Sequence, residues 1–400
     1  MGLDFLRSSP EPSPASPYDR PDRQRRRRQR RRSRRRRLIL LVLLVVLSPV
    51  LYSYVVTMMK PSSLPLGVRS VEWLRAHGGA WLVDDVERLY YRWTAPAKGG
   101  PALRTLPTVG VSVPHRAPSF RPKRIRPAIT PSLPGEGVWR TTGPLVSGAP
   151  PLLVTTFRPD PSYPRLVAYV GWIDHTRTQL GLYPGRYEPP SSQLRGPMDV
   201  PQGQRWRLLA TFNSGFTYND GRGGFAVDGR EYTPLQRGMG TIVAYRNGTV
   251  NVINWRGGAA PGHAIVLARQ NLPLIVNGSR PNPNLSDGPE WGATLGNAIR
   301  VWRSGVGIDR HGNLIYVAAD YQTVASLAAI LIKAGAIRAI QLDINTEWPS
   351  FITYLHGGAV DPSKLVPNPL QSATRYLVPD DRDFFTVYRR IPNRTTVPFR

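Results

Sequence analysis

The sequence predicts an α+β protein: a body built on a mixed β-sheet with one buried helix, preceded by a single transmembrane helix and a proline-rich spacer. Three features predict it. Residues 38–56 are apolar and uncharged, prolines crowd the segment before residue 138, and short β-branched and aromatic runs after it surround one long apolar run at 323–334. Strands grouped around a single helix are typical of the α+β class. The 400 residues, 41% of them hydrophobic, suffice for one large domain or two smaller ones.

The membrane span is predicted at residues 38–56, LILLVLLVVLSPVLYSYVV. A helix rises ~1.5 Å per residue, so this run crosses a hydrocarbon layer of ~30 Å. A cleaved signal peptide is the main alternative, because a basic stretch followed by an apolar one also fits its pattern. The run exceeds a typical signal-peptide core, and the following TMMKPSS has no A-x-A-like cleavage site. We therefore expect an uncleaved anchor.

Arginines set the expected orientation. Twelve arginines and no acid lie between Arg23 and Arg37. The positive-inside rule then places a disordered tail, residues 1–37, in the cytoplasm and the chain after Lys60 outside the cell membrane. Such a run could also bind nucleic acid or lipid headgroups. Beside a membrane span the topological interpretation is favoured, and no nucleic-acid partner is expected.

Charge and cysteine content narrow the chemistry. The net charge is +27, of which residues 1–37, with fourteen arginines and four acids, contribute +10, leaving +17 for the rest. A basic exterior domain is consistent with anionic substrates or anionic envelope polymers. The chain has no cysteine, which excludes disulfides, thiolate nucleophiles and cysteine-ligated metal sites.

Residues 57–137 are predicted to link the span to the body. Apolar spacings of three and four over residues 68–93 predict two helical segments broken at Gly78 and Gly79. These helices could lie on the membrane surface or dock on the main domain, and docking is favoured. The prolines of 94–137 predict an extended spacer, so the catalytic body is expected at 138–400.

Within the body, several short β-branched or aromatic runs predict strands. They are 152–157, 165–172, 206–212, 241–245, 249–255, 338–342 and 384–388. Hairpin turns are expected at 246–248 and 310–313. Residues 323–334, TVASLAAILIKA, are apolar nearly all round and are followed by Gly335, which predicts a buried helix ending there.

Candidate site residues stand at the ends of predicted strands. No G-x-S-x-G, P-loop, Rossmann or H-E-x-x-H motif is present. The candidates are Asn213, Ser214 and Gly215 after one strand, Arg303 before another, and Asp320, Asp343 and Glu347. Each also fits an ordinary role, since Asn and Asp form turns and Asp320 could cap the following helix. Together they suit an anionic substrate, because arginine forks onto phosphate oxygens and a carboxyl moves a proton.

At these residues the sequence resembles the phosphodiester glycosidase family, which includes N-acetylglucosamine-1-phosphodiester α-N-acetylglucosaminidases, and a bacterial, membrane-anchored member is implied. The segments that carry the resemblance are ATFNSGF (210–216), RSGVGIDRHGNL (303–314) and AIQLD (339–343), within roughly 205–355. The family pattern has N-G-G-F-F, R-T-x-x-G-x-d-x-d-G-x-L, V-V-D-G and N-L-D-G-G-G-S segments. Residues of this chain that match it are Asn213, Gly215, Arg303, Gly307, Asp320 and Asp343.

The chain also departs from that pattern. Ser214 and Thr217 replace Gly and Phe, Tyr321 replaces the Gly after Asp320, and residues 344–346 replace three glycines beside Asp343. If those glycines let the backbone close on the substrate, Ile344 narrows the site. The resemblance then implies either a different substrate or lost activity.

The function expected from the resemblance is extracellular hydrolysis of a glycosyl-1-phosphodiester in a cell-surface polysaccharide or wall polymer, through an oxocarbenium-like state. Arg303 would clamp the phosphate, Asp343 would act as acid or base with Asp320 beside it, and Asn213 would bind sugar or phosphate; Glu347 is a substitute carboxyl. The alternative is a degenerate membrane-tethered scaffold that binds anionic envelope polymers without turnover. No cofactor is expected, although Asp320, Asp343 and Glu347 could hold a divalent cation. The sugar and the oligomeric state stay open.

Overall fold

The structure, a computed structural model, describes residues 19–111, 122–286, 288, 291–292 and 300–391. The chain divides into two compact units, residues 1–60 and 61–400. The disorder predicted for the first 18 residues lies outside the described part.

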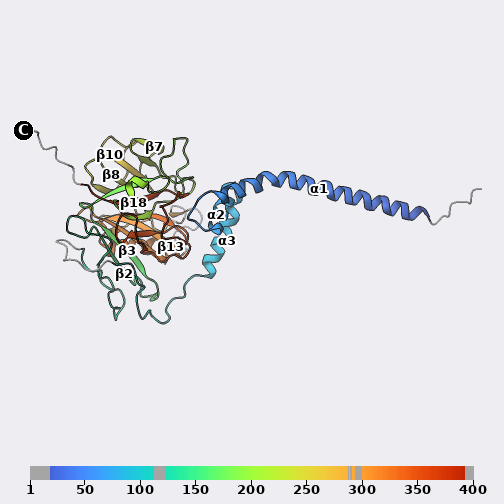
Figure 1. Cartoon of the computed structure of the whole chain (residues 1–400). Coiled ribbons are helices and arrows are strands. Elements are labelled where there is room, and N and C mark those ends of the chain that lie inside the picture. The colour runs from blue at the N-terminus through green and yellow to red at the C-terminus, as the bar shows by residue number, and fades with distance from the viewer. Residues whose placement is uncertain (1–18, 112–121, 287, 289–290, 293–299, 392–400) are drawn as a thin grey trace, which may run out of the picture. The chain divides into compact units, whose positions relative to one another are not determined.

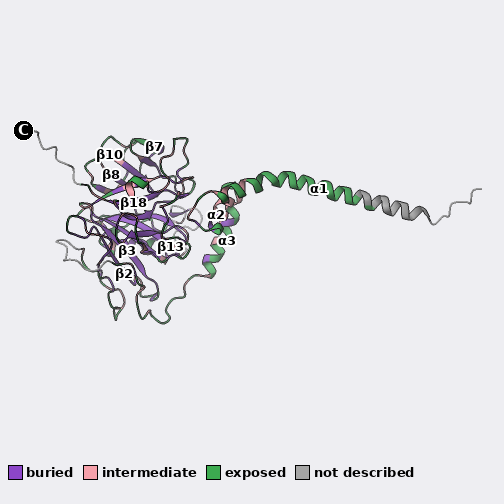
Figure 2. Ribbon diagram, viewed as in Figure 1, coloured by how far each residue is buried: buried purple, intermediate pink, exposed green. Residues whose placement is uncertain are grey.

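The first unit is one long helix, α1 (Asp19–Met59). Its part from Arg32 to Met59 is long and apolar enough to cross a membrane, and it contains the predicted span. Figure 2 colours this part mostly as exposed. The helix begins at Asp19, whereas the sequence predicted disorder through residue 37. Arginine is a good helix former, so the basic run continues the helix of the span.

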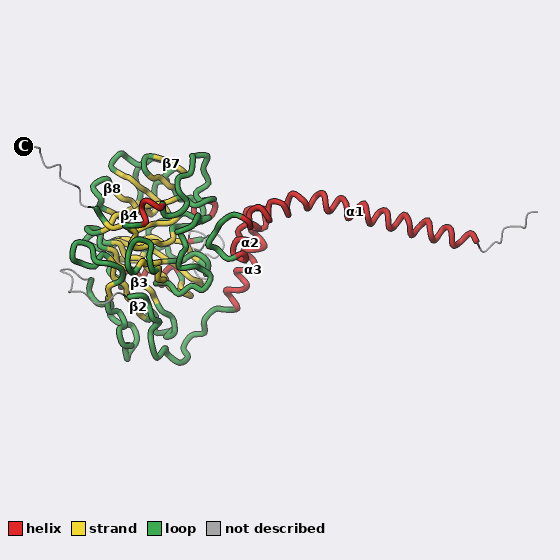
Figure 3. Tube along the Cα trace, viewed as in Figure 1, coloured by secondary structure: helices red, strands yellow, loops and turns green. Residues whose placement is uncertain are grey.

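The second unit contains few helices (Figure 3). They are α2 (Leu66–Leu74), a π-helical turn (Arg75–Gly79), α3 (Ala80–Trp93), α4 (Gln202–Arg205), α5 (Tyr218–Gly221) and α6 (Val324–Lys333). The predicted break between α2 and α3 is confirmed: His77 and Gly78 leave the helical conformation, and Gly78 has a φ of 87°. Glycine adopts this left-handed conformation without steric cost.

The described residues of the body form three antiparallel sheets, and Figure 1 labels strands from each of them. The eight-stranded sheet has the order β1 (Arg140–Thr141), β2 (Leu152–Phe157), β3 (Ala168–Ile173), β14 (Leu314–Gln322), β13 (Val301–Ile308), β15 (Arg338–Ile344), β11 (Val276–Asn277) and β12 (Arg280–Pro281). One five-stranded sheet has the order β7 (Arg230–Thr233), β6 (Phe225–Val227), β10 (Ile265–Gln270), β8 (Gly240–Tyr245) and β9 (Val250–Asn254). The other has the order β17 (Pro362–Lys364), β16 (Phe351–Tyr354), β5 (Leu208–Asn213), β18 (Phe384–Arg389) and β4 (Thr178–Tyr183).

These elements confirm the α+β class. Each predicted strand corresponds to an observed one, with ends shifted by at most a few residues. Both predicted hairpins are present, since β8 pairs with β9 and β13 pairs with β14, each antiparallel.

The large sheet is covered on both faces, which explains its apolar central strands. On one face α6 packs through Val324, Leu327 and Leu331, in a cluster with Val170 and Val317 and other buried residues. The opposite face joins the smaller sheets in a second cluster. It includes Phe212, Phe351, Phe385, Tyr316 and Leu342. Strands buried on both faces lose the alternation of apolar and polar residues that marks a half-exposed strand.

Local signals fix the ends of α6. Thr323 caps it and forms a capping box with Ser326, so Asp320 does not serve as the cap. Gly335 follows the helix with a φ of 105°, as the sequence predicts. Because Thr323 caps the helix, the Asp320 carboxyl is available for another role.

The proline-rich segment packs on the body where it is described. Val109 and Ile125 are buried. Glu136 forms a buried ion pair with Arg158 at 2.9 Å and accepts the backbone N–H of the same arginine. The sequence predicted an extended spacer as far as residue 137, but this ion pair ties its last residues into the body.

Candidate functional site

Asn213, at the end of β5, is hydrogen-bonded to β13 and β14. Its Oδ1 accepts hydrogen bonds from the Tyr316 hydroxyl at 2.9 Å and the Ser350 amide at 3.0 Å. Its Nδ2 donates to the Ser214 carbonyl at 2.9 Å and the Ser304 hydroxyl at 3.0 Å. A carboxamide has two donors and two main acceptor positions, so these four bonds fill its capacity. In this state Asn213 holds β5, β13 and β14 in place.

This network leads directly to Asp343. The Ser304 hydroxyl donates to the Asp343 carbonyl at 2.7 Å, and the Asp343 amide donates to the Ser214 carbonyl at 3.0 Å. The structure therefore brings together Asn213, Ser214 and Asp343, three of the residues that the sequence singled out. Gly215 lies beside them, and a Cβ there would sit 2.8 Å from the Asn271 side chain. Close packing accounts for this glycine.

The Asp343 carboxyl is buried and forms an ion pair with Arg382. Burial raises the pKa of Asp343 to about 7 in spite of the Arg382 charge, and the nearby acids Asp220 and Glu72 add to the rise. A carboxyl that titrates near neutral pH can take up or release a proton under physiological conditions.

Arg382 is surrounded by several acids. Glu72 lies 3.7 Å from its Nη1, and Asp343 and Glu188 also favour its charged form. Glu188 is buried, which raises its pKa to about 7, and it accepts the Tyr218 amide at 3.0 Å. Asp343 and Glu188 are both buried near this one guanidinium, and burial raises the pKa of each to about 7, so these two carboxyls titrate near neutral pH.

Helices α2 and α3 cover this cluster, which confirms the predicted docking. Leu64 and Val68 pack on Trp348. The Asn345 amide group donates to Glu87 at 3.3 Å, and the Thr346 backbone N–H donates to the Tyr91 hydroxyl at 3.3 Å. Arg75 ties the two helices together by ion pairs to Glu72 at 3.2 Å and Glu87 at 2.7 Å.

Two residues beside the candidate carboxyls have the left-handed backbone conformation that glycine favours. Asn345 has a φ of 73° and Tyr321 a φ of 50°. Asparagine tolerates the left-handed region, whereas an aromatic residue is strained there. Asn345 therefore adopts a conformation that glycine favours, and its side chain contacts Glu87.

Arg303 lies on the opposite face of β13 from Ser304, because neighbouring residues of a strand alternate. It is fully buried, its Nε donates to the Gln322 carbonyl at 2.7 Å, and its Nη1 donates to the Gln341 side chain at 3.0 Å. Burial lowers the pKa of Arg303 to about 9. The phosphate-clamping role given to it stays a prediction.

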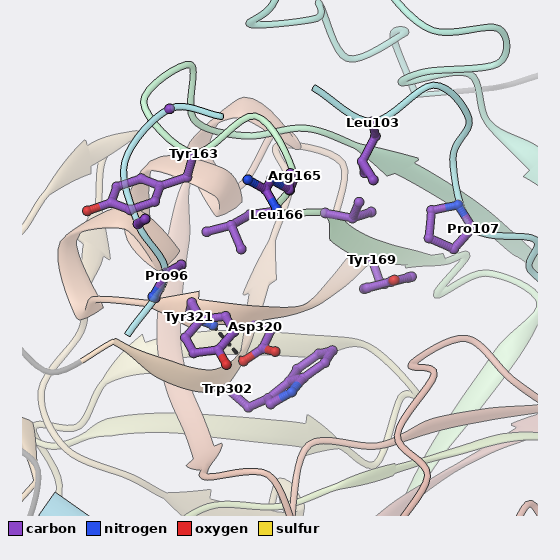
Figure 4. A pocket seen from close by; sticks show the side chains of 13 residues that line it. Pro96, Leu103, Pro107, Tyr163, Arg165, Leu166, Tyr169, Trp302, Asp320 and Tyr321 are labelled. Carbon is purple, nitrogen blue, oxygen red and sulfur yellow. Dashed lines mark hydrogen bonds between the residues drawn. The ribbon is translucent and has the colours of Figure 1, made fainter. Parts of the chain in front are cut away.

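Asp320 lines a different hollow, a cavity of about 460 Å³ shown in Figure 4. The walls include Tyr169 and Trp302, whose rings stack with centroids 6.3 Å apart, and part of the proline-rich segment near Pro96. Burial raises the pKa of Asp320 to about 6, while the backbone N–H of Tyr321 donates to it at 2.7 Å. Trp302, which lines the cavity, stands two residues before Ser304 of the Asp343 network on β13, where the pairing with β14 shifts register between Val301 and Arg303.

Glu347 faces the covering helices. Burial raises its pKa, Arg75 counteracts this, and Glu72 adds to it. Burial raises the pKa values of Glu87 and Tyr91, and the charge of Glu347 adds to both rises. Whether Glu347 can substitute for Asp343 stays a prediction. Within the described ranges, no three His, Asp or Glu side chains are arranged to hold a metal ion.

Sequence reasoning missed Arg382, Glu188 and Glu72. A signal for the first was present in the DDRD segment at 380–383. Each of its acids is paired with an arginine: Asp381 with Arg186 and Asp383 with Arg269, both far away in the sequence, and Asp380 with Arg375, five residues earlier. Such a dense charge run next to an apolar strand indicates buried ion pairs rather than a solvated tail.

No protein-family model and no curated protein matches the chain. Among solved structures, it is similar to a zebrafish N-acetylglucosamine-1-phosphodiester α-N-acetylglucosaminidase catalytic domain, auto-inhibited by its pro-peptide, at 14% identity and a TM-score of 0.43, over 63% of this chain and 87% of that one. A hypothetical protein from Synechocystis matches at 14% identity and a TM-score of 0.38, over 63% and 65% of the two chains. An exported protein from Burkholderia pseudomallei matches at 13% identity and a TM-score of 0.35, over 57% of this chain and 75% of that one. These are distant likenesses in fold, and they carry nothing about activity.

Proposed function

We propose that the domain after the span hydrolyses a glycosyl-1-phosphodiester of a cell-surface polysaccharide or wall polymer. The observation that carries this proposal is the buried Asp343 carboxyl, whose pKa is raised to about 7 and which is paired with Arg382 at the meeting point of β5, β13 and β15. The sequence resemblance to phosphodiester glycosidases supports it, because Asp343 falls on the family's N-L-D segment.

Asp343 acts as the base in this mechanism. The departing group is a phosphate monoester, which leaves as an anion and needs no proton. Water therefore adds to the anomeric carbon, the bond from that carbon to the phosphate oxygen breaks with its electron pair, and the water proton passes to Asp343. Arg382 is well suited to bind the phosphate, since a guanidinium forks onto phosphate oxygens.

The cavity beside Asp320 accepts the glycan that flanks the reacting bond. Aromatic rings pack against the CH faces of a sugar, and a carboxyl accepts hydrogen bonds from its hydroxyls. Tyr169, Trp302 and Asp320 supply both in one hollow. This assignment keeps Asp320 in the substrate site as a binding residue next to the reacting centre.

The test is release of free sugar from N-acetylglucosamine 1-(methyl phosphate) and related sugar-1-phosphodiesters by the full chain in detergent. We expect Asp343→Asn to lower the rate by ~10²-fold or more. Asp85→Asn, at an exposed position of α3, is the control and should keep full activity. Full activity of Asp343→Asn would overturn the proposal.

One observation favours the scaffold alternative. Asp343 and Arg382 are almost inaccessible beneath α2, so a substrate reaches them only when the covering helices move. A chain that binds an anionic polymer such as teichoic acid, but releases no sugar from any diester tested, would establish the scaffold in place of the hydrolase.

A further inference from the structure

Helix α3 has two different faces. Val83 and Tyr91 are buried against the body, and Glu87 on the same side contacts Asn345. The opposite side carries Leu82, Val86, Leu89 and Trp93, which are 45%, 59%, 49% and 79% exposed. We call these four residues the outer stripe.

The outer stripe is continuous along the helix. Its members are four, three and four residues apart, so they fall on one side of a helix with 3.6 residues per turn. Tyr90 borders it and is also exposed. Isolated exposed apolar residues are ordinary, whereas a row of four over the length of a helix indicates a surface that another apolar phase covers.

The chain itself indicates what that phase is. The apolar part of α1 ends at Met59, and α2 begins at Leu66. The intervening residues 60–65 reach at most ~20 Å even when fully extended. If α1 crosses a bilayer, the membrane surface is therefore held close to α2 and α3 in every molecule, whereas a second copy must be met by diffusion.

The residue types match a lipid interface. Tryptophan and tyrosine are enriched where hydrocarbon meets headgroups, and the outer stripe ends on Trp93 with Tyr90 beside it. Arg88 and Arg92 are exposed on the same helix, Arg88 in an ion pair with Asp85 at 3.1 Å, and cationic side chains there attract anionic headgroups.

We propose that α3 lies in the interface of the membrane crossed by α1, with the outer stripe inserted among the lipids and the opposite face docked on the body. The helix then contacts the bilayer with one side and covers the Asp343 cluster with the other. This goes beyond the proposed hydrolysis and rests only on α1 being a membrane span.

The absence of cysteine allows a clean test in the full chain, because a single introduced cysteine is the only labelling site. Val86→Cys places a nitroxide spin label on the outer stripe. Val360→Cys is the matched control, since Val360 is 57% exposed in the body and has the same side chain. Both proteins are reconstituted into phosphatidylcholine–phosphatidylglycerol vesicles.

The label at 86 should be more accessible to oxygen, which dissolves in lipid, than to a water-soluble nickel chelate, and the label at 360 should show the reverse. Adding Leu89→Glu should shift the label at 86 toward the aqueous pattern, because a charge is expelled from the interface. Equal aqueous accessibility of both labels would overturn the proposal. So would dipolar broadening between labels at 86, which would show that a second copy covers the stripe.

Discussion

Arg382 is the residue on which the charge balance of the candidate site depends. Its guanidinium serves Asp343, Glu72 and Glu188 while stacking over the Trp348 ring at 4.4 Å. A phosphate that displaced Asp343 from Arg382 would leave the carboxyl free to accept a proton. In the proposed mechanism the same exchange would let one buried arginine serve both the closed site and the substrate.

The pH dependence of hydrolysis should follow Asp343. A base works in its ionised form, so activity should rise as the pH increases through about 7, the raised pKa of Asp343. Glu72→Gln removes a negative charge that raises this pKa, and the acid limb of the profile should therefore shift to lower pH. The measurement is the initial rate of sugar release from pH 5 to pH 9, the range being about two units either side of 7.

Asp85→Asn provides the control for this shift, because Asp85 is exposed and pairs only with Arg88 among the ion pairs found. Its profile should coincide with that of the unaltered chain. A Glu72→Gln profile displaced to higher pH, or unchanged, would contradict the placement of Glu72 beside the reacting carboxyl.

Single site residues could be predicted where they stand at the end of a recognisable strand. Asn213, Ser214 and Asp343 could be grouped because each follows a recognisable apolar strand. Arg303 shows the limit, since its side of β13 is decided by the register with β14 and β15, which no local pattern reveals. Arg382 was missed because its partners lie far away in the sequence.

At the scale of elements, the strands and the buried helix α6 were predictable from local chemistry. Turn residues, β-branched runs and the glycine after α6 determine the backbone structure within a few residues of their own positions. The number of sheets was not predictable in this way. One mixed sheet was expected, whereas three antiparallel sheets are observed, because strand partners such as β5 and β18 are joined by tertiary packing over long separations.

For helices α2 and α3 we predict that substitution of one glycine is destabilising and that substitution of another is stabilising. Gly78→Ala should destabilise the packed pair of helices α2 and α3 by ~1 kcal/mol, because a φ of 87° puts a Cβ in the strained left-handed region. Gly67→Ala should stabilise it by a similar amount, since Gly67 lies within α2 with open space around it. Protease cleavage between the two helices should accelerate in the first variant and slow in the second. Equal rates would contradict the observed break between α2 and α3.

At the scale of the whole chain, charge is divided unevenly between the first 37 residues and the rest. Residues 1–37 carry +10, concentrated in the run from Arg23 to Arg37, and the remaining +17 is spread over the rest of the chain. The run continues the helix of the span, so its arginines lie immediately on one side of the apolar segment. The proposed substrate, a cell-surface polymer, depends on which side that is, because the domain can reach such a polymer only from outside the cell.

Orientation is therefore the last prediction. Deleting residues 23–37 removes twelve arginines next to the span and should yield a mixture of orientations, because the positive-inside bias is lost. Deleting residues 1–18, a segment of similar length with one arginine, is the matched control and should leave the orientation uniform. In the Val360→Cys background, a membrane-impermeant thiol reagent applied to intact cells should label the unaltered chain and the control fully, and the arginine deletion only in part. Full labelling of all three would show that the arginines serve another purpose, such as binding an anionic polymer, and that the span is oriented by the folding of the domain that follows it.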